Sequence, residues 1–439
     1  MSDNRYRYTA LFRISSVGHP GVMPTTLVLA PSRRHGRAFW AVAFALLMVM
    51  AYSAVPTPLY VIYQQRDGFS AFMITVIYAA YAVGVVVSLF LAGHVSDWHG
   101  RRRVFVPGLM LSIVSAGVFL VWSDVPGLVI GRVIDGLSIG AVTATATTWL
   151  AELHAAHRPD ADTRRAQSVA TAANLGGIGF GPLVAGALAE WVGHPLIIPY
   201  VVFVVGMVVA LGGVLLSPET RDRPSPKPRY RAQRVSVPRA ARREYLAAAL
   251  GALIAFAALG LFNSLAPSFL AGTLGHPSRA LAGAVAFLVF AAAAVAQLLA
   301  ANRSARNQVA TGIAGMLAGM GLLVVGVWLP TPSLALFLVG GSVVGAGAGL
   351  LFKGALGTVV AIAADEHRAE ALAGLFLAGY VGLSVPVIGL GVLTQSLQAK
   401  VSLLIFAGLL AVGALAAAPM LLERPGKRSG TAALLADAA

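Results

Sequence analysis

Charged residues inside long apolar segments are the clearest candidates for chemistry in this sequence. Arg132 and Asp135 lie three positions apart in the apolar run 127–150. On a helix they share a face and can form an ion pair. An ionisable group in hydrocarbon is costly and by default marks a functional site. We therefore treat the pair as a candidate site, and a purely structural ion pair is the alternative.

Lys353 is a second charged residue of this kind, in the apolar run 334–361. Asp365 follows twelve residues later, so on an unbroken helix Lys353 lies about 18 Å from that end. This depth prevents easy access to water unless the helix breaks at Gly354 or Gly357. A buried lysine needs a partner, so Lys353 is a candidate for binding an anionic substrate or pairing with a carboxylate. An inner-end lysine of a shorter span is the alternative.

Uncharged polar residues within the apolar runs are candidates for lining a central cavity. For each of them, a hydrogen bond between packed helices is the alternative role. They are Tyr52, Asn174, Asn263, Gln297 and Tyr380.

The sequence carries no pattern for a cofactor, a metal or an enzyme nucleophile. It has no cysteine, which excludes disulfides and thiolate metal sites. It also lacks a Gly-rich phosphate loop ending in Lys-Ser/Thr, a histidine pair with zinc-site spacing, and a nucleophile elbow. We expect no cofactor, no metal and no enzymatic activity.

The segments that must position these residues are apolar and long. The 439 residues are 58% hydrophobic and 11% charged, whereas a soluble domain carries about 25% charged residues. A bilayer span needs about 20 apolar residues. We expect an all-α membrane protein with spans at 39–62, 71–93, 104–122, 127–150, 166–189, 196–216, 245–270, 279–301, 309–329, 334–361, 371–394 and 400–422.

The basic residues set the orientation of these spans. With the N-terminus inside, 27 of the 32 lysines and arginines fall in inner loops and tails, and the outer loops carry Arg66, Arg279 and Lys400. Positive charge marks the cytoplasmic side, so we expect both termini there. On a soluble domain, a net charge of +15 would suggest that the protein binds nucleic acid. Here the basic residues lie in loops between apolar spans, so we expect a lipid bilayer around the chain and no nucleic-acid partner.

The chain divides into two halves around a polar, Arg- and Pro-rich linker, which we expect to be disordered. Binding of anionic lipid by its basic residues is an alternative role. No cleavable signal peptide is evident, and Met23 is an alternative start. The expected parts are an N-terminal tail at 1–38, a bundle at 39–216, the linker at 217–244, a bundle at 245–422 and a C-terminal tail at 423–439.

Three correspondences between the halves support an internal duplication. Each falls in matching spans at nearly the same offset. They pair Ser53-x-x-Pro56 with Ser264-x-x-Pro267, Arg101 with Arg306, and Pro182 with Pro386.

The residue types of the short polar hinge 93–103, between the second and third spans, suit a tight and charged turn. Gly93 lets two helix ends approach closely, and Gly100 permits a turn with unusual dihedral angles. Asp97 stands among arginines and can pair with one of them or cap a helix. Arg101 and Arg102 mark the cytoplasmic face.

This hinge resembles the signature loop of the major facilitator superfamily. The resemblance rests on Gly93-x-x-x-Asp97-x-x-Gly100-Arg101-Arg102-Arg103, twelve spans, a central basic linker and the 6+6 duplication. It implies two pseudo-symmetric six-helix bundles that alternate access to a central substrate path. It also implies that Asp97 and Arg101 latch the two halves together in the outward-facing state. The second-half counterpart, 302–306, has lost the acid and both glycines, so we expect the latch to be one-sided.

Two further motifs resemble those of the same family. Arg132-x-x-Asp135-Gly136 resembles its second motif, Arg-x-x-Gln-Gly, with aspartate in place of glutamine, and implies a role for Arg132 and Asp135 in proton coupling. The run 177–186 resembles the antiporter motif, although Ala185 replaces a glycine. It implies export, and the matching residues are Gly177, Gly181, Pro182 and Gly186.

We therefore expect a monomeric, proton-coupled secondary transporter of the bacterial inner membrane that exports small organic molecules or drugs. Its partners would be a small-molecule substrate and protons. A proton-coupled uptake symporter for a sugar, organic acid or other metabolite is the main alternative. A membrane sensor or scaffold that moves no substrate is a remote one.

Overall fold

The computed structural model describes residues 33–92, 95–159, 161–221, 233–235, 237 and 241–422. Every regular element in these ranges is a helix. Twelve helical segments there are long and apolar enough to cross a membrane. The expected all-α class with twelve spans is therefore confirmed. Gly93, most of the linker and both expected tails outside 33–422 lie beyond the described residues.

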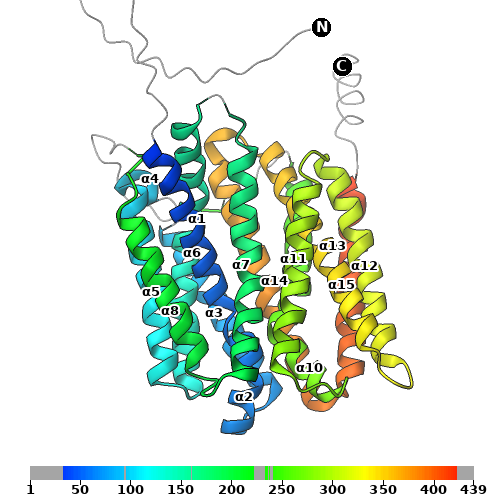
Figure 1. Cartoon of the computed structure of the whole chain (residues 1–439). Helices are drawn as coiled ribbons and strands as arrows, with labels where there is room; N and C mark the ends of the chain where they lie inside the picture. Colours follow the sequence, from blue (N-terminus) through cyan, green and yellow to red (C-terminus); the bar gives the residue numbers. More distant parts are fainter. Residues whose placement is uncertain are drawn as a thin grey trace, which may run out of the picture.

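The N-terminal bundle contains the first six spans, and Figure 1 shows it on the side coloured blue to green. Its long helices run antiparallel to their neighbours, because the turns between them are short. The helices are α1 (Arg33–Ala54), α2 (Pro56–Asp67), α3 (Ala71–Ala92), α4 (Ser96–His99), α5 (Arg101–Val121), α6 (Val125–His157), α7 (Arg164–Trp191) and α8 (Ile198–Leu215).

The C-terminal bundle repeats this arrangement beside it (Figure 1). Its first helix begins three residues before the expected bundle boundary at 245. The helices are α9 (Arg242–Ser264), α10 (Ala266–Gly272), α11 (Arg279–Leu299), α12 (Ala305–Trp328), α13 (Leu334–Ile362), η2 (Asp365–His367), α14 (Arg368–Ser396) and α15 (Ala399–Leu422).

The first span of each bundle is divided into two helices at its Ser-x-x-Pro sequence. Pro56 opens α2, and Pro267 is the second residue of α10. A proline has no backbone N–H and its ring crowds the carbonyl four residues earlier, so a helix breaks or bends there. The two halves thus share a local structural feature at the positions that the internal repeat indicated.

Each bundle has its own apolar core, and apolar side chains also cover the outside. The core of the first bundle is built from its long helices and α2, with Leu383 and Val387 of α14 added where the bundles meet. Val121 and Leu299 are 90% and 79% exposed. Exposed apolar side chains in such numbers are what a lipid-facing surface requires. Trp149 is fully buried, and its ring lies against that of Phe105.

The bundles meet where α7 packs on α11 and α3 packs on α14. At the end away from the termini, α2 also contacts α10 and α11 across the interface. Two hydrogen bonds close this end: the Thr57 hydroxyl donates to the Asn263 carbonyl (3.1 Å), and the Arg279 backbone N–H donates to Glu190 Oε2 (2.8 Å). We call this the opposite end.

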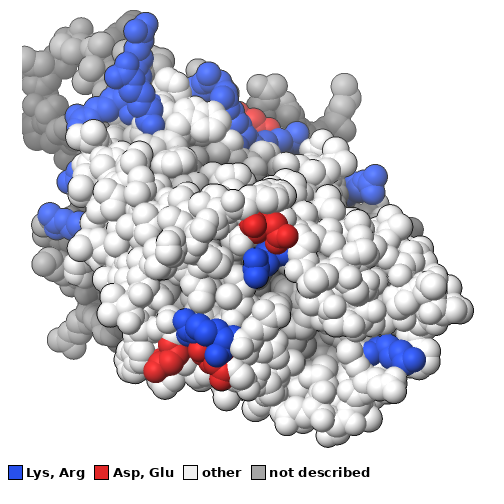
Figure 2. All heavy atoms as spheres, turned by 60° about the horizontal axis from the view of Figure 1, so that its bottom comes forward, with Lys and Arg blue, Asp and Glu red and all other residues white. Residues whose placement is uncertain are grey.

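The other end, where α1 begins and α15 ends, carries most of the described positive charge, and we call it the basic end. At the opposite end the basic residues of the described chain are Arg66, Arg279 and Lys400. Figure 2 shows that the opposite face is largely uncharged, with a few isolated charged clusters. The asymmetry matches the charge distribution along the sequence.

Candidate functional site

The hinge after α3 forms a compact ion-pair cluster at the basic end. Gly100 has φ 98° and ψ 151°, a conformation open to glycine at little cost. This turn places Asp97 in α4 one helical turn from Arg101 at the start of α5. Asp97 Oδ1 pairs with Arg101 Nη1 at 2.7 Å, and the Arg101 guanidinium is almost fully buried.

Two acidic residues outside the hinge complete the cluster. Glu152 of α6 accepts from Arg101 Nη2 at 2.8 Å and from its Nε at 3.2 Å. The Glu219 carboxylate accepts hydrogen bonds from the backbone N–H groups of Arg101 (2.7 Å) and Arg102 (3.1 Å). A carboxylate at that position satisfies free N–H groups of α5 and complements its dipole. Among the described residues, neither Asp97 nor Arg101 forms an ion pair with the C-terminal half.

We expect Glu152→Gln to destabilise the protein more than Asp97→Asn. Glu152 makes two charge-assisted bonds to a buried guanidinium, so its loss should cost about 1–3 kcal/mol. Asp97 is 48% exposed and makes one such bond, so water replaces it more easily. Thermal unfolding in detergent measures both variants, and Glu366→Gln, an exposed acid at the same end, is the control. An equal loss for the two variants would contradict this account of the cluster.

A second cluster lies deep in the N-terminal bundle, around Arg132 and Asp135 of α6. The two side chains pair at 3.0 Å and are 2% and 1% exposed. Arg132 Nη1 also donates to the Ser53 carbonyl at 2.6 Å, at the end of α1. Its guanidinium lies 4.6 Å from the ring centre of Tyr81 and 5.6 Å from that of Tyr78, both on α3. Such cation–π contacts stabilise a desolvated cation.

The buried pair is incompletely satisfied. Asp135 Oδ1, Arg132 Nε and the Tyr60 hydroxyl are buried and have no hydrogen-bond partner among the described residues. Buried polar atoms in native proteins are nearly always paired, and exceptions are explained by strain, a bound water or ion, or a functional role. The free carboxylate oxygen gives the site an atom that can accept a proton.

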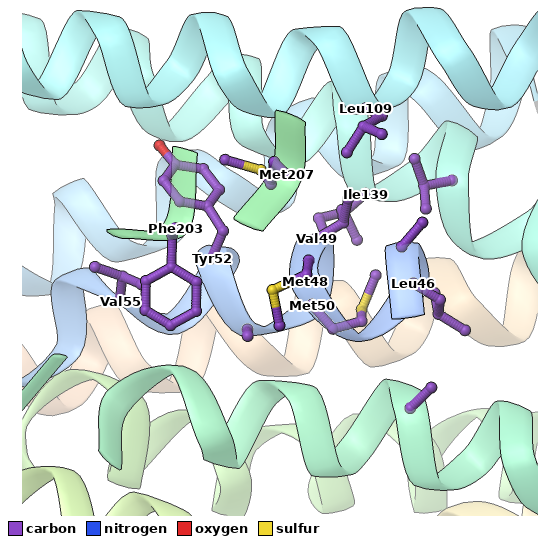
Figure 3. Packing of buried hydrophobic residues seen from close by; sticks show 14 of the residues in the cluster. Leu46, Met48, Val49, Met50, Tyr52, Val55, Leu109, Ile139, Phe203 and Met207 are labelled. Carbon is purple, nitrogen blue, oxygen red and sulfur yellow. The ribbon is translucent and has the colours of Figure 1, made fainter. Parts of the chain in front are cut away.

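Tyr52 lies inside the N-terminal bundle, away from the interface between the halves. It is 1% exposed, and its hydroxyl shares a 2.7 Å hydrogen bond with Ser115, which donates to the Gly131 carbonyl. Figure 3 shows its ring among Phe203, Met207 and other core side chains. The structure thus places this residue in helix packing, the alternative that the sequence left open.

The small residues of α7 allow it to pack closely against two different helices. Gly177 and Gly181 face α1, where a Cβ would meet backbone atoms of α1. Gly186 faces α11 of the other bundle, next to Arg279. Pro182 also contacts α11, because its carbonyl lies where a Cβ of Gly283 would be. One motif therefore packs both within its bundle and across the interface.

Lys353 and Gln297 lie together in the C-terminal bundle. Helix α13 continues without a break to Ile362, so Lys353 stays deep in its span. Its ammonium donates to the Gln297 carbonyl of α11, and the Gln297 amide donates to the Gly349 carbonyl at 3.0 Å. Lys353 is partly exposed and forms no ion pair among the described residues. It is a cation deep in the bundle with a neutral partner.

Two of the three remaining polar candidates, Asn263 and Tyr380, contact the other bundle. Asn263 is buried, its carbonyl accepts from Thr57, and its Oδ1 has no hydrogen-bond partner among described residues. Asn174 of α7 is partly exposed. Tyr380 of α14 lies between Tyr81 of the other bundle (ring centres 6.3 Å apart) and Phe256 (5.6 Å).

Tyr380 belongs to a chain of aromatic rings that the sequence did not reveal. Phe256 continues to Phe352 (5.0 Å), the residue before Lys353, and Phe352 continues to Phe376 (5.8 Å). With Tyr81 beside Arg132, the rings connect the surroundings of the buried ion pair to those of the lysine. No spacing pattern relates these residues, because they come from four different helices.

Comparison with known proteins gives a family match over most of the chain. The model of the Major Facilitator Superfamily matches residues 39–315. An arabinose-proton symporter of Bacillus subtilis (strain 168) is 34% identical over 83 residues, which are 19% of this chain and 18% of that protein. The matched segments span 18% to 38% of the lengths of the curated relatives.

Solved structures share the fold over nearly their whole length. The human organic anion transporter MFSD10 superposes with a TM-score of 0.63 at 19% identity, covering 89% of this chain and 99% of that one. A point mutant of the nucleoside transporter NupG superposes with a TM-score of 0.67 at 13% identity, covering 87% of this chain and 99% of that one. At these identities the likeness establishes the fold alone.

Proposed function

The chain belongs to the major facilitator superfamily, a family of membrane transporters, and we propose that it exports small organic molecules in exchange for protons. In this proposal the two bundles rock about their interface, so that the central path opens at one end at a time. The basic end faces the cytoplasm of a bacterial inner membrane, and a single chain is the working unit.

The observation that carries the proposal is the buried Arg132–Asp135 pair. Asp135 is 1% exposed and keeps one carboxylate oxygen without a hydrogen-bond partner among the described residues. A buried carboxylate in a membrane span is suited to carry a proton. In this proposal Asp135 carries the proton, and the Arg132 guanidinium moves when the charge of Asp135 changes.

Protonation of Asp135 changes the forces on its neighbours. It removes the negative charge 3.0 Å from Arg132, which leaves a buried cation held by the Ser53 carbonyl and the rings of Tyr78 and Tyr81. An uncompensated buried charge is costly, so the guanidinium shifts. Tyr81 contacts Tyr380 of the other bundle, which gives this shift a route to the interface.

Export is favoured by the packing of α7. Its run of glycines around Pro182 resembles a motif associated with antiporters, and it forms the contact with α11 at the opposite end. In our proposal this end, closed here by Thr57–Asn263 and Glu190–Arg279, opens to release substrate and admit protons. Asp97, Gly100 and Arg101 hold the basic end of the N-terminal bundle rigid while it moves.

Uptake by symport is the second candidate. It is favoured by the similarity to an arabinose-proton symporter, which covers 83 residues. The two functions differ in the direction of substrate relative to protons, and both use the same buried pair.

A substrate screen followed by a transport assay separates the two functions. Growth of an efflux-deficient bacterium expressing the chain identifies compounds to which it confers resistance. A resistance compound is then tested in proteoliposomes with an imposed pH gradient. Accumulation against the proton flow supports antiport. Movement of the compound with the protons would replace the antiport proposal by symport, and absence of any flux across the panel would contradict transport of small organic molecules.

We expect Lys353→Gln to change which substrates are carried. The ammonium lies deep in the bundle, with a carbonyl as its partner and aromatic rings nearby, so it favours substrates with a negative charge. The variant should lower affinity for anionic substrates by about tenfold, the effect of about 1.4 kcal/mol, and leave neutral ones unchanged. Competition assays with anionic and neutral compounds measure this, with Lys400→Gln as the control. Unchanged selectivity would assign Lys353 to helix packing.

A further inference from the structure

A cavity of about 310 Å³ opens at the basic end between the start of α1, the end of α6 and the start of α7. It is lined by Arg33, Arg37, Arg158 and Arg165, together with His154 and His157. All three helices belong to the N-terminal bundle. Within the described part of the chain, no residue of the C-terminal bundle lines this cavity.

The charge around this cavity is one-sided. No carboxylate is among its lining residues in the described part of the chain. The acids near it in sequence have other partners: Asp162 pairs with Arg164 at 3.0 Å, and Glu152 pairs with Arg101. A concave surface lined with one sign of charge concentrates the field and attracts an ion of opposite sign.

The walls give the cavity a defined shape. Phe39 is 4% exposed and lies against the rings of Trp40 and His154. His154 is held by a 3.2 Å hydrogen bond to the Asp162 carbonyl. Gly36 leaves room for His157, since a Cβ there would come within 2.9 Å of its ring. Trp40 is 55% exposed beside the opening, as expected at the level of lipid headgroups.

We propose that this cavity binds a phosphate group. Four exposed arginines that line one small cavity suit a multiply charged anion with several acceptor oxygens, because arginine matches phosphate with paired hydrogen bonds. The group is carried by an anionic phospholipid or by a soluble phosphate compound. Occupancy neutralises the repulsion among the arginines and ties α1 to α6 and α7.

Binding measurements on the full chain in nanodiscs test this inference and separate the two sources. Inorganic phosphate is titrated into nanodiscs of phosphatidylcholine, and phosphatidylglycerol is added to matched nanodiscs in a second series, with thermal stabilisation as the readout. Stabilisation by phosphate assigns a soluble ligand, and stabilisation by phosphatidylglycerol alone assigns a lipid. Absence of both would overturn the inference.

Two variants distinguish a built site from general attraction by positive charge. The double variant Arg37→Gln/Arg165→Gln should weaken binding at least about tenfold, because it removes charge-assisted hydrogen bonds. The control Arg303→Gln/Arg306→Gln removes the same charge from the same end of the other bundle and should leave binding unchanged. Gly36→Leu keeps every cation but fills the cavity, and it should weaken binding as the double variant does. Equal weakening by the control pair, or wild-type binding by Gly36→Leu, would contradict the site.

Discussion

Asp135→Asn should abolish transport driven by a pH gradient while the protein still reaches the membrane. Asparagine has nearly the same shape but cannot gain or lose a proton, so Arg132 is left permanently without its counter-ion. Removing one partner of a buried ion pair costs about 3–5 kcal/mol, so thermal stability should also fall. Proteoliposomes with and without an imposed pH gradient measure the first effect, and thermal unfolding in detergent measures the second.

The matched control is Asp124→Asn. Asp124 is the N-cap of the same helix, where its side chain accepts a hydrogen bond from the Gly127 N–H at 3.3 Å. Asparagine caps a helix about as well as aspartate, so this change removes a charge at the helix end and none deep in the bundle. Asp124→Asn should therefore keep pH-driven transport. If Asp135→Asn retained transport at the level of this control, the pair would be a structural ion pair.

Gly283→Val should produce the second large effect, on the closed contact between the bundles. A Cβ at Gly283 would overlap the Pro182 carbonyl of the other bundle, and neither backbone has a flexible atom to move away. Overpacking of this kind costs about 1–3 kcal/mol. Because the clash exists only when the opposite end is closed, it shifts the equilibrium towards the open form by roughly 5- to 150-fold. Transport should fall, since alternating access needs both forms.

Gly389→Val controls for adding bulk to a membrane span. Gly389 lies in α14, and a Cβ there meets no atom within 4 Å. The control should keep both transport and stability. Gly283→Val should keep folded bundles, because the clash lies between them, and its melting curve in detergent checks this point. Wild-type transport by Gly283→Val would mean that the α7–α11 contact does not close during the cycle.

Features that depend on local order along the chain were predictable from the sequence. Apolar segment length indicated twelve spans, and three-residue spacing indicated that Arg132 and Asp135 would pair. Gly100 was expected to permit a turn, and Asp97 to pair with an arginine or cap a helix; the structure has the turn and an Asp97–Arg101 ion pair. Each of these features depends on residues that are close together along the chain.

Features that depend on neighbouring helices were not predictable in this way. Glu152 lies near a span end, where a carboxylate is ordinarily solvated, yet it makes two hydrogen bonds with Arg101. Lys353 finds a carbonyl of α11 rather than a carboxylate, and Tyr52 points into its own bundle. Periodicity tells which face of a helix a residue occupies, but not which helix packs on that face. The available signal was that Glu152 is an acid on the same side of the membrane as the arginines of the hinge. It was therefore a possible partner for one of them.

The central claim is that the charge of Asp135 controls the opening of the opposite end. The sequence contains no cysteine, so cysteines placed at Gln65 and His276 accept spin labels at two defined sites. These exposed residues line a small cavity between α2 and the α10–α11 turn, on opposite bundles. Their separation, measured by pulsed electron resonance in nanodiscs, should differ between acidic and alkaline pH. The Asp135→Asn variant should give one distribution at both. A pH-dependent separation that persists unchanged in Asp135→Asn would contradict the account.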